Sequence, residues 1–351
     1  MKETLRVVVC QLTCHPAIYT GQQMWLEEPF IPENRTHTLS YLSVQGFKVD
    51  HLLEKCKETY IAWHTDRLSG VLEFLKTLHP IPSLVIFPEG SIPYQCLTLI
   101  HAFCSETKAT IFAGTHSFQR LKELRQIYNV IGVKERTIEK LHKKAAEVNG
   151  IAPIFIHDKV FMVPKKIFSP FESTDISPSE IASERFVPFN IPLGDKKTTV
   201  LPLICAEALN FTKLKIKGDY AICVILSYDK TPAHFRALVD MLVANKKTVV
   251  YCNDGRFGGS GLLIPIDQRR TMWWYDSSFK GQLPTGDAIL IADIDLRNIA
   301  VEIGVTSPSK NFNLVKLCSI TYGKDPACSL VSEEMERIKR IEEPFTKTKA
   351  I

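Results

Sequence analysis

The chain has 351 residues, of which 45% are hydrophobic and 23% charged, the composition of an ordinary globular protein with a large core. Its net charge of +5 is mild and its lysines are spread along the sequence, so a nucleic-acid partner is not expected. No apolar run reaches the roughly 20 residues that a membrane-spanning helix needs, and ten cysteines in this length are too few for a disulfide scaffold.

The first residues, MKETLRVVVCQLTC, become polar too soon for a secretory signal, so we expect a cytoplasmic protein with reduced thiols. Cys10 and Cys14 stand beside His15, which raises the question of a zinc site. A further pair of ligands at zinc-site spacing is not found in the sequence. We therefore expect no metal and no cofactor.

The first half of the chain alternates strand and helix patterns. Leu5 to Leu12 is a short, β-branched apolar run, typical of a buried strand. After a polar, Pro-containing stretch, residues 50–78 carry apolar residues at three- and four-residue steps and predict a long amphipathic helix or two shorter ones. The sequence then predicts a strand ending in the turn PEG (83–90), a helix (94–108) and a third strand (109–118).

The second half continues with polar residues 136–147, which we interpret as local decoration, followed by more strands. Strand patterns recur at 150–164, 197–204, 219–228, 248–252, 258–267 and 288–296, and residues 233–247 predict an amphipathic helix. The segment SEEMERIKRIEE (332–343) is typical of an exposed helix capped by Ser332. Alternating strands and helices with short connections predict an α/β fold around a central sheet, in one domain of catalytic size.

Three polar groups stand at the ends of predicted strands, where open α/β sheets place their ligands. Glu89 follows LVIFP, Lys165 and Lys166 follow VFMVP, and Cys205 ends VLPLI. Taken singly, each has an ordinary explanation, because a cysteine in an apolar strand is usually packing and a glutamate after proline is usually solvated. Together, a thiol, a carboxylate and an ammonium are the groups that nucleophilic acyl chemistry uses.

These segments, in this order, resemble the nitrilase, or carbon-nitrogen hydrolase, superfamily over roughly residues 5–297. LVIFPEGSIP is similar to the family's general-base motif, PKKIFSPFE to its lysine motif and LPLICAE to its nucleophile motif. Further likenesses are VVVCQL to the opening strand, YNVIGVKE to a strand carrying Tyr-Asn, NDGRFGGSGLLIP to the Asn, Gly-Gly-Ser and apolar strand, and GDAILIADIDL to the closing strand. In the family pattern the lysine stands five residues before the proline, and counting back from Pro170 selects Lys165.

The resemblance implies an αββα sandwich of the nitrilase type over residues 1–300. Insertions are expected at about 15–78 and 136–150, with a helical C-terminal extension at 301–351. Members of the family commonly pair, so a homodimer is implied. The insertion or the C-terminal tail would be where a partner protein binds.

The resemblance also assigns roles. Cys205 would attack the carbon of an amide, or of a nitrile, and form a thioester. Glu89 would move the proton, and Lys165 with the backbone N–H of Ala206 would hold the oxyanion. Glu172 would support Lys165. Two alternatives stay open: a catalytically silent or weakly active module of the same fold that binds a small ligand or a partner, and acyl transfer to an amine instead of water.

Overall fold

The computed structural model describes residues 4–14, 49–116, 121–143, 150–167, 185–193, 196–229, 231–267, 270–273, 286–295 and 312–319. The chain divides into two compact units, one of residues 1–14 and 72–321 and the other of residues 15–71 and 322–351. All of the described strands belong to the first unit. No helix in the described part of the chain is long and apolar enough to cross a membrane.

The first sheet has eight strands, and seven of them lie in the order β16-β15-β1-β2-β3-β5-β4, with β6 paired to β5. The central neighbours β1, β2 and β3 are parallel, and the other pairs are antiparallel. The bounds are β1 Thr4–Gln11, β2 Leu84–Ile86, β3 Thr110–Phe112, β4 Thr115–His116, β5 Gly150–Ile156, β6 Lys159–Pro164, β15 Ala288–Asp295 and β16 Phe312–Ser319.

The second sheet has six strands in the order β14-β13-β12-β11-β9-β8, of which β12, β11 and β9 are parallel. Its bounds are β8 Phe189–Leu193, β9 Lys196–Ile204, β11 Ile222–Leu226, β12 Thr248–Cys252, β13 Gly261–Asp267 and β14 Arg270–Trp273. A separate two-stranded ribbon joins β7 Arg185–Phe186 to β10 Lys215–Ile216.

The two sheets pack face to face, and one apolar core lies between them. Alternate residues of both sheets share this core: Val7 and Val9 of β1 and Leu290 of β15 from the first, and Val224 of β11 and Val250 of β12 from the second. Such alternation follows from the two-residue period of a strand, which sends neighbouring side chains to opposite faces. Helices cover the outer faces, so the expected αββα order is found in the first unit.

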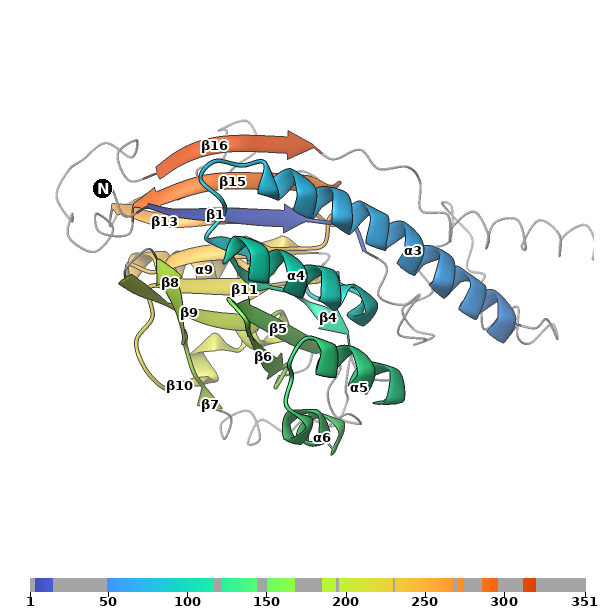
Figure 1. Cartoon of the computed structure of the whole chain (residues 1–351). Coiled ribbons are helices and arrows are strands. Elements are labelled where there is room, and N and C mark those ends of the chain that lie inside the picture. Colours follow the sequence, from blue (N-terminus) through green and yellow to red (C-terminus); the bar gives the residue numbers. More distant parts are fainter. Residues whose placement is uncertain are drawn as a thin grey trace, which may run out of the picture. The chain divides into compact units, whose positions relative to one another are not determined.

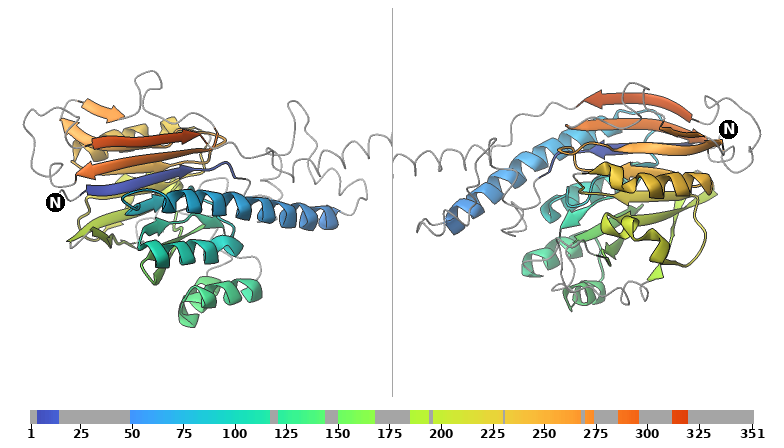
Figure 2. Two further views of the ribbon diagram at one scale, coloured as in Figure 1. Left: turned by 45° about the horizontal axis from the view of Figure 1, so that its top comes forward. Right: turned by 180° about the vertical axis from the view of Figure 1, so that it is seen from behind.

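Helix α4 (Leu97–Thr107) packs on β3 and β5 of the first sheet, and α9 (Arg236–Ala244) packs on β12 and β13 of the second (Figures 1 and 2). A second apolar cluster, with Phe235, Leu238 and Val249 among its members, fills the space between α9 and its sheet. The other helices in the described ranges are α3 Val49–Lys76, α5 Leu121–Val130, α6 Glu135–Lys143 and α8 Ala206–Leu209, with short 3-10 turns at Tyr94–Cys96, Phe211–Lys213 and Pro232–Phe235.

Two expectations differ from the structure. Tyr128 and Asn129, expected on a strand, form the last turn of α5, because LKELRQIYNV places apolar residues at helical spacing. A helical C-terminal extension was expected beyond residue 300, but Phe312–Ser319 form β16, an edge strand paired antiparallel with β15. The predicted helix at 332–343 lies outside the described residues.

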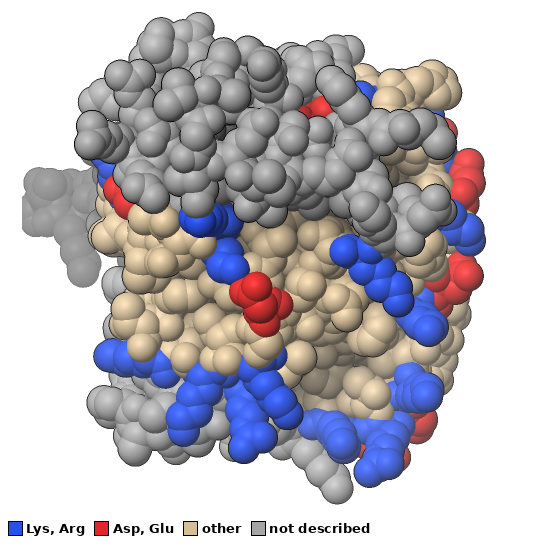
Figure 3. Space-filling view, turned by 90° about the vertical axis from the view of Figure 1, so that its left-hand side faces the viewer, with Lys and Arg blue, Asp and Glu red and all other residues tan. Residues whose placement is uncertain are grey.

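Exposed positive side chains follow the β7–β10 ribbon. Lys215 and Arg185 stand directly opposite each other in its register, and Lys213 and Lys217 are exposed beside them. Like charges placed across a strand pair repel. On the face at the left of Figure 1, Lys and Arg side chains outnumber Asp and Glu side chains among those coloured (Figure 3). The ribbon therefore brings Arg185 beside three lysines that lie two residues apart in the sequence.

Shortening a side chain in the core between the sheets is expected to lower the free energy of unfolding strongly. Leu290 is fully buried there, and Leu290→Ala is expected to lower the free energy of unfolding by about 2–5 kcal/mol, since it removes packed methyl groups and leaves a cavity. Urea denaturation measures this. The exposed control Lys213→Ala should change stability by no more than about 0.5 kcal/mol. A loss at Leu290 as small as that of the control would contradict the shared core.

Candidate active site

Glu89 lies at the carboxyl end of β2. Strand β2 is fully buried. Glu89 lies in the turn that follows it, which Gly90 completes at φ +65°. The backbone N–H and the hydroxyl of Ser91 both donate to the carbonyl of Pro88, at 3.3 and 2.8 Å. The turn is therefore held from within, and the Glu89 side chain is only 11% exposed.

Lys165 follows β6 and is 2% exposed. Its ammonium Nζ donates a hydrogen bond to Glu89 Oε1 at 2.7 Å, across 76 residues of sequence. Two buried charges are tolerated only as a pair, and removing one partner of such a pair commonly costs about 3–5 kcal/mol. Two of the predicted catalytic residues thus form an ion pair beyond the ends of β2 and β6 in the first sheet.

Cys205 directly follows β9, at the carboxyl end of that strand of the second sheet. Its backbone N–H continues the ladder by donating to Leu226 O at 2.8 Å, and the chain then turns sharply into α8. The turn places Cys205 at φ +43° and ψ −103°, a conformation that costs a residue with a side chain about 1–3 kcal/mol. Ala206 opens α8, so its N–H has no carbonyl four residues earlier in that helix to donate to.

Glu207 joins the lysine segment to the cysteine segment. Its Oε1 accepts the N–H of Lys166 at 2.6 Å, and its Oε2 accepts the N–H of Ile204 at 2.8 Å. One fully buried carboxylate therefore fixes the residues adjacent to Lys165 and to Cys205. Burial raises the pKa of this carboxyl to about 7, although the two N–H donors and the charges of Lys165 and Lys166 oppose the increase.

Two hydroxyl groups not selected from the sequence lie beside the sulfur. Ser227 Oγ donates to Cys205 Sγ at 3.9 Å, and Tyr251 donates its hydroxyl to Ser227 Oγ at 3.2 Å. Burial raises the pKa of Tyr251 well above its usual value, so this phenol stays a neutral donor. Ser227 directly follows β11, so the rule that selected the other strand ends would also have selected it.

Four of the six other free thiols in the described part of the chain are placed differently. Cys10, Cys104, Cys223 and Cys252 are buried, and burial raises the pKa of each, to about 12 for Cys104. A thiol becomes nucleophilic only as the thiolate, so these four are unreactive packing residues. Cys205 differs from them because its sulfur accepts a hydrogen bond from a hydroxyl at the end of a strand.

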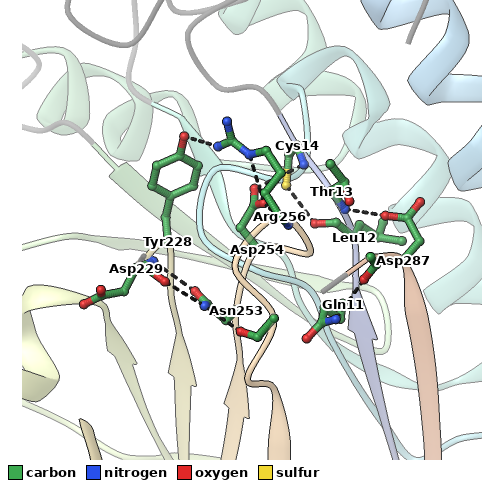
Figure 4. Close-up of polar contacts among 12 residues, drawn as sticks. Gln11, Leu12, Thr13, Cys14, Tyr228, Asp229, Asn253, Asp254, Arg256 and Asp287 are labelled. Carbon is green, nitrogen blue, oxygen red and sulfur yellow. Dashed lines mark hydrogen bonds and ion pairs between the residues drawn. The ribbon is translucent and has the colours of Figure 1, made fainter. Parts of the chain in front are cut away.

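The loop after β12 is held by the asparagine of NDGRFGGSG. Asn253 Nδ2 donates to the carbonyls of Asp229 and Gly258, both at 2.8 Å, and its Oδ1 accepts the N–H of Asp229 at 2.9 Å. Gln11, at the end of β1 in the other sheet, accepts the N–H of Ser260 at 3.2 Å. Figure 4 shows Asn253 beside Asp229 in the second sheet, and Gln11 at the end of β1 in the first.

Glu172, expected to support Lys165, lies outside the described residues. Within the described ranges, no three His, Cys, Asp or Glu side chains gather in a way that could hold a metal ion. The described site thus consists of an ion pair, a thiol at a strained turn, and a carboxylate that joins their two segments.

No family model matches this sequence, and no curated protein does. Among solved structures, the chain is similar to Saccharomyces cerevisiae Nit3, a member of branch 10 of the nitrilase superfamily, at 13% identity over 88% of this chain and 97% of that one, with a TM-score of 0.48. It is also similar to an amidase from Nesterenkonia sp., at 12% identity over 85% and 93% of the two chains, with a TM-score of 0.46.

A third similar structure is the glutamine-dependent NAD+ synthetase of Acinetobacter baumannii, at 13% identity with a TM-score of 0.45. There the match covers 91% of this chain but 49% of the synthetase. Identities this low leave the chemistry to be argued from this chain's own residues.

The turn that carries Glu89 predicts a specific effect at Gly114. A Cβ at this position would lie 2.0 Å from Pro88 O and 2.6 Å from Glu89 Cα, so the backbone must move. Gly114→Ala is expected to lower the free energy of unfolding by about 1–3 kcal/mol, as overpacking does. The control is Gly70→Ala, with open space around it in α3, which should stabilise by up to about 1 kcal/mol. Equal stability of Gly114→Ala and the native chain would refute this crowding.

The raised pKa of Glu207 predicts how stability depends on pH. The pKa of this carboxyl rises from its ordinary value of 4.5 to about 7 in the folded protein. The protonated carboxyl therefore contributes fully to the free energy of unfolding below pH 4.5, and this contribution is lost as the pH rises through 7. Relative to Glu207→Gln, which cannot ionise, the native chain should lose on the order of 3 kcal/mol between pH 4.5 and pH 8. Urea denaturation of both proteins across this range measures the difference, and parallel pH profiles would show that burial does not raise this pKa.

Proposed function

We propose that the protein hydrolyses a non-peptide carbon-nitrogen bond, that of an amide in preference to a nitrile, through a cysteine thioester. The observation that carries the proposal is the buried pairing of Lys165 with Glu89, joined through Glu207 to the turn that presents Cys205. A thiol after β9, a carboxylate after β2 and an ammonium after β6 would supply a nucleophile, a proton carrier and a cation.

In the first half-reaction the sulfur of Cys205 attacks the amide carbon, and its proton passes to the Glu89 carboxylate. The carbonyl oxygen becomes an oxyanion, which Lys165 Nζ and the N–H of Ala206 stabilise. A preorganised donor of this kind contributes on the order of 3 kcal/mol to the barrier. The carbon-nitrogen bond then breaks, the protonated Glu89 gives its proton to the leaving nitrogen, and ammonia departs from the thioester.

In the second half-reaction the Glu89 carboxylate takes a proton from water, and the resulting hydroxide attacks the thioester carbon. The carbon-sulfur bond breaks, and the acid is released while Cys205 recovers its proton from Glu89. The net reaction consumes one water per amide and yields one acid and one ammonia. Ser227 donates to the sulfur and would stabilise its anionic form in both halves.

The proposal keeps the assembly that the family resemblance implies and the cytoplasmic location expected from the sequence. The protein would be a cytoplasmic homodimer, and residues 15–78 or the C-terminal tail would bind a partner protein. Light scattering of the purified chain tests the dimer, with a mass of one chain as the contrary result.

The test of the chemistry is turnover and labelling at Cys205. Ammonia release from a panel of amides and nitriles should be abolished in Cys205→Ala and reduced at least about 100-fold in Cys205→Ser, since the hydroxyl lacks a thiolate's nucleophilicity. Intact-mass spectrometry should show one acyl group on Cys205. The matched control, Cys223→Ala, removes a buried thiol of the neighbouring strand and should retain turnover.

The same measurements separate the alternatives. Normal turnover by Cys205→Ala would refute the nucleophile. A chain that neither turns over nor becomes acylated across the panel would be a binding module of this fold. If an added amine replaces water in the product, the reaction is acyl transfer.

A further inference from the structure

The β7–β10 ribbon carries a lysine row, formed by Lys213, Lys215 and Lys217. These three positions are exposed, whereas Leu214 and Ile216 between them are partly buried against the apolar cluster beneath α9. The chain is extended from Leu214 onward, so the alternation follows the two-residue period of a strand. Successive lysines are therefore presented to solvent at a spacing of about 7 Å, the length of two strand residues.

The backbone that carries the lysine row is held in place by the cluster and by β7. The N–H of Lys217 donates to the carbonyl of Phe186 at 2.8 Å, and the Phe186 side chain is buried in the same cluster. The ammonium of Lys166 lies 4.7 Å from the centre of that ring and donates to the carbonyl of Arg185. A ligand therefore meets a row of charges whose backbone is already ordered.

The charge of the lysine row is not neutralised by the described part of the chain. The three lysines and Arg185, which stands opposite Lys215 in the register, are exposed, and none of them forms an ion pair with a described carboxylate. Asp219, the next acid along the sequence, is held by Lys247 at 2.7 Å. Like charges opposite each other repel, so an anion lying along the row would relieve this repulsion.

The surroundings of the lysine row favour a peptide over other polyanions. Single-stranded nucleic acids stack on exposed aromatic rings, and membrane-surface elements insert large apolar side chains. The aromatic residue of the ribbon, Phe186, is buried, and the exposed apolar side chain beside it is that of Val187. Lysine is a point charge suited to a single carboxylate, whereas bidentate binding of phosphate favours arginine. An extended peptide with acids at alternate positions matches the spacing of the lysines.

We propose that the lysine row docks an acidic segment of a partner protein, bound in extended conformation beside β10 with Asp or Glu at alternate positions. Among the described strands β10 pairs only with β7, so an added strand would pair along its other edge. Opposite charges that face each other across a strand pair stabilise the pairing. This docking surface lies outside residues 15–78 and the C-terminal tail, and it does not depend on the proposed reaction.

Fluorescence anisotropy with labelled peptides tests the proposal at a salt concentration of about 0.15 M. One peptide alternates glutamate with threonine, and an isomer of the same composition has its glutamates contiguous. The native chain should bind the alternating peptide about 10-fold more tightly than the isomer, since each exposed ion pair contributes about two- to five-fold. The variant Lys213→Ala/Lys215→Ala/Lys217→Ala should bind the alternating peptide about 10- to 100-fold more weakly and lose the preference.

The matched control is Lys134→Ala/Arg136→Ala/Lys140→Ala, which removes three exposed cations in and beside α6 and changes the net charge equally. It should keep the native affinity and the native preference. An unchanged Tm in both triple variants establishes that the fold is intact. Replacing the lysine row by glutamates should transfer binding to a peptide that alternates lysine with threonine.

Equal affinity for the two glutamate peptides, equal losses in the ribbon variant and the control, or no binding of either peptide would overturn the proposal. A single-stranded oligonucleotide and phosphatidylserine-containing vesicles are measured beside the peptides. If removal of the lysines weakens either of these more than the alternating peptide, the row binds that ligand and the proposal is wrong. A changed mass of the ribbon variant in light scattering would identify the row as a contact between copies of this chain, which also overturns it.

Discussion

An ammonium and a carboxylate buried together must hold each other, because neither can keep its charge alone in an apolar interior. Lys165 and Glu89 meet this constraint at 2.7 Å, from strands β6 and β2 of the first sheet. The surrounding structure is arranged to keep the pair in place. Gly114 lets the connection between β3 and β4 approach the Glu89 turn closely, and Glu207 fixes the backbone beside Lys165.

The second sheet contributes the thiol of the candidate site. Cys205 is held in an unfavourable backbone conformation by a regular ladder before it and a short helix after it. Strain of this kind persists only where the surroundings determine the position several times over. Both sheets contribute residues to one apolar core, and β2, which leads to Glu89, and β9, which leads to Cys205, are both among the strands that pack in it.

Much of this could be predicted from the sequence, because short apolar runs such as Leu84–Ile86 and Ile222–Leu226 become strands buried on both faces. Parallel strands align their carboxyl ends, so residues far apart in the chain reach one edge. Glu89, Lys165 and Cys205 could be selected by that rule, and the direct contact of Lys165 with Glu89 agrees with it. The assignment of their catalytic roles came from the family resemblance and stays a proposal.

Other features could not be predicted, because they depend on contacts between distant segments. In the sequence, Glu207 stands out only as part of the LPLICAE motif. Nothing in the adjacent residues indicates that its two carboxylate oxygens accept hydrogen bonds from N–H groups 41 and three residues away. The pairing of β16 with β15 likewise depends on the exposed edge of a completed sheet. The error at Tyr128 has another cause, since the helical spacing of α5 was present in the sequence and was outweighed by the resemblance.

The Glu207 carboxylate has a consequence for when the site exists at all. Glu207 accepts the N–H of a residue 41 positions away, and Lys165 donates to a residue 76 positions away. No local stretch of the chain can therefore assemble the site by itself. Contacts between such distant residues form late in folding, after the loops between them have closed. A newly made or partly unfolded chain would therefore carry the Cys205 thiol as an ordinary cysteine, and its reactivity would arise only with the completed native structure.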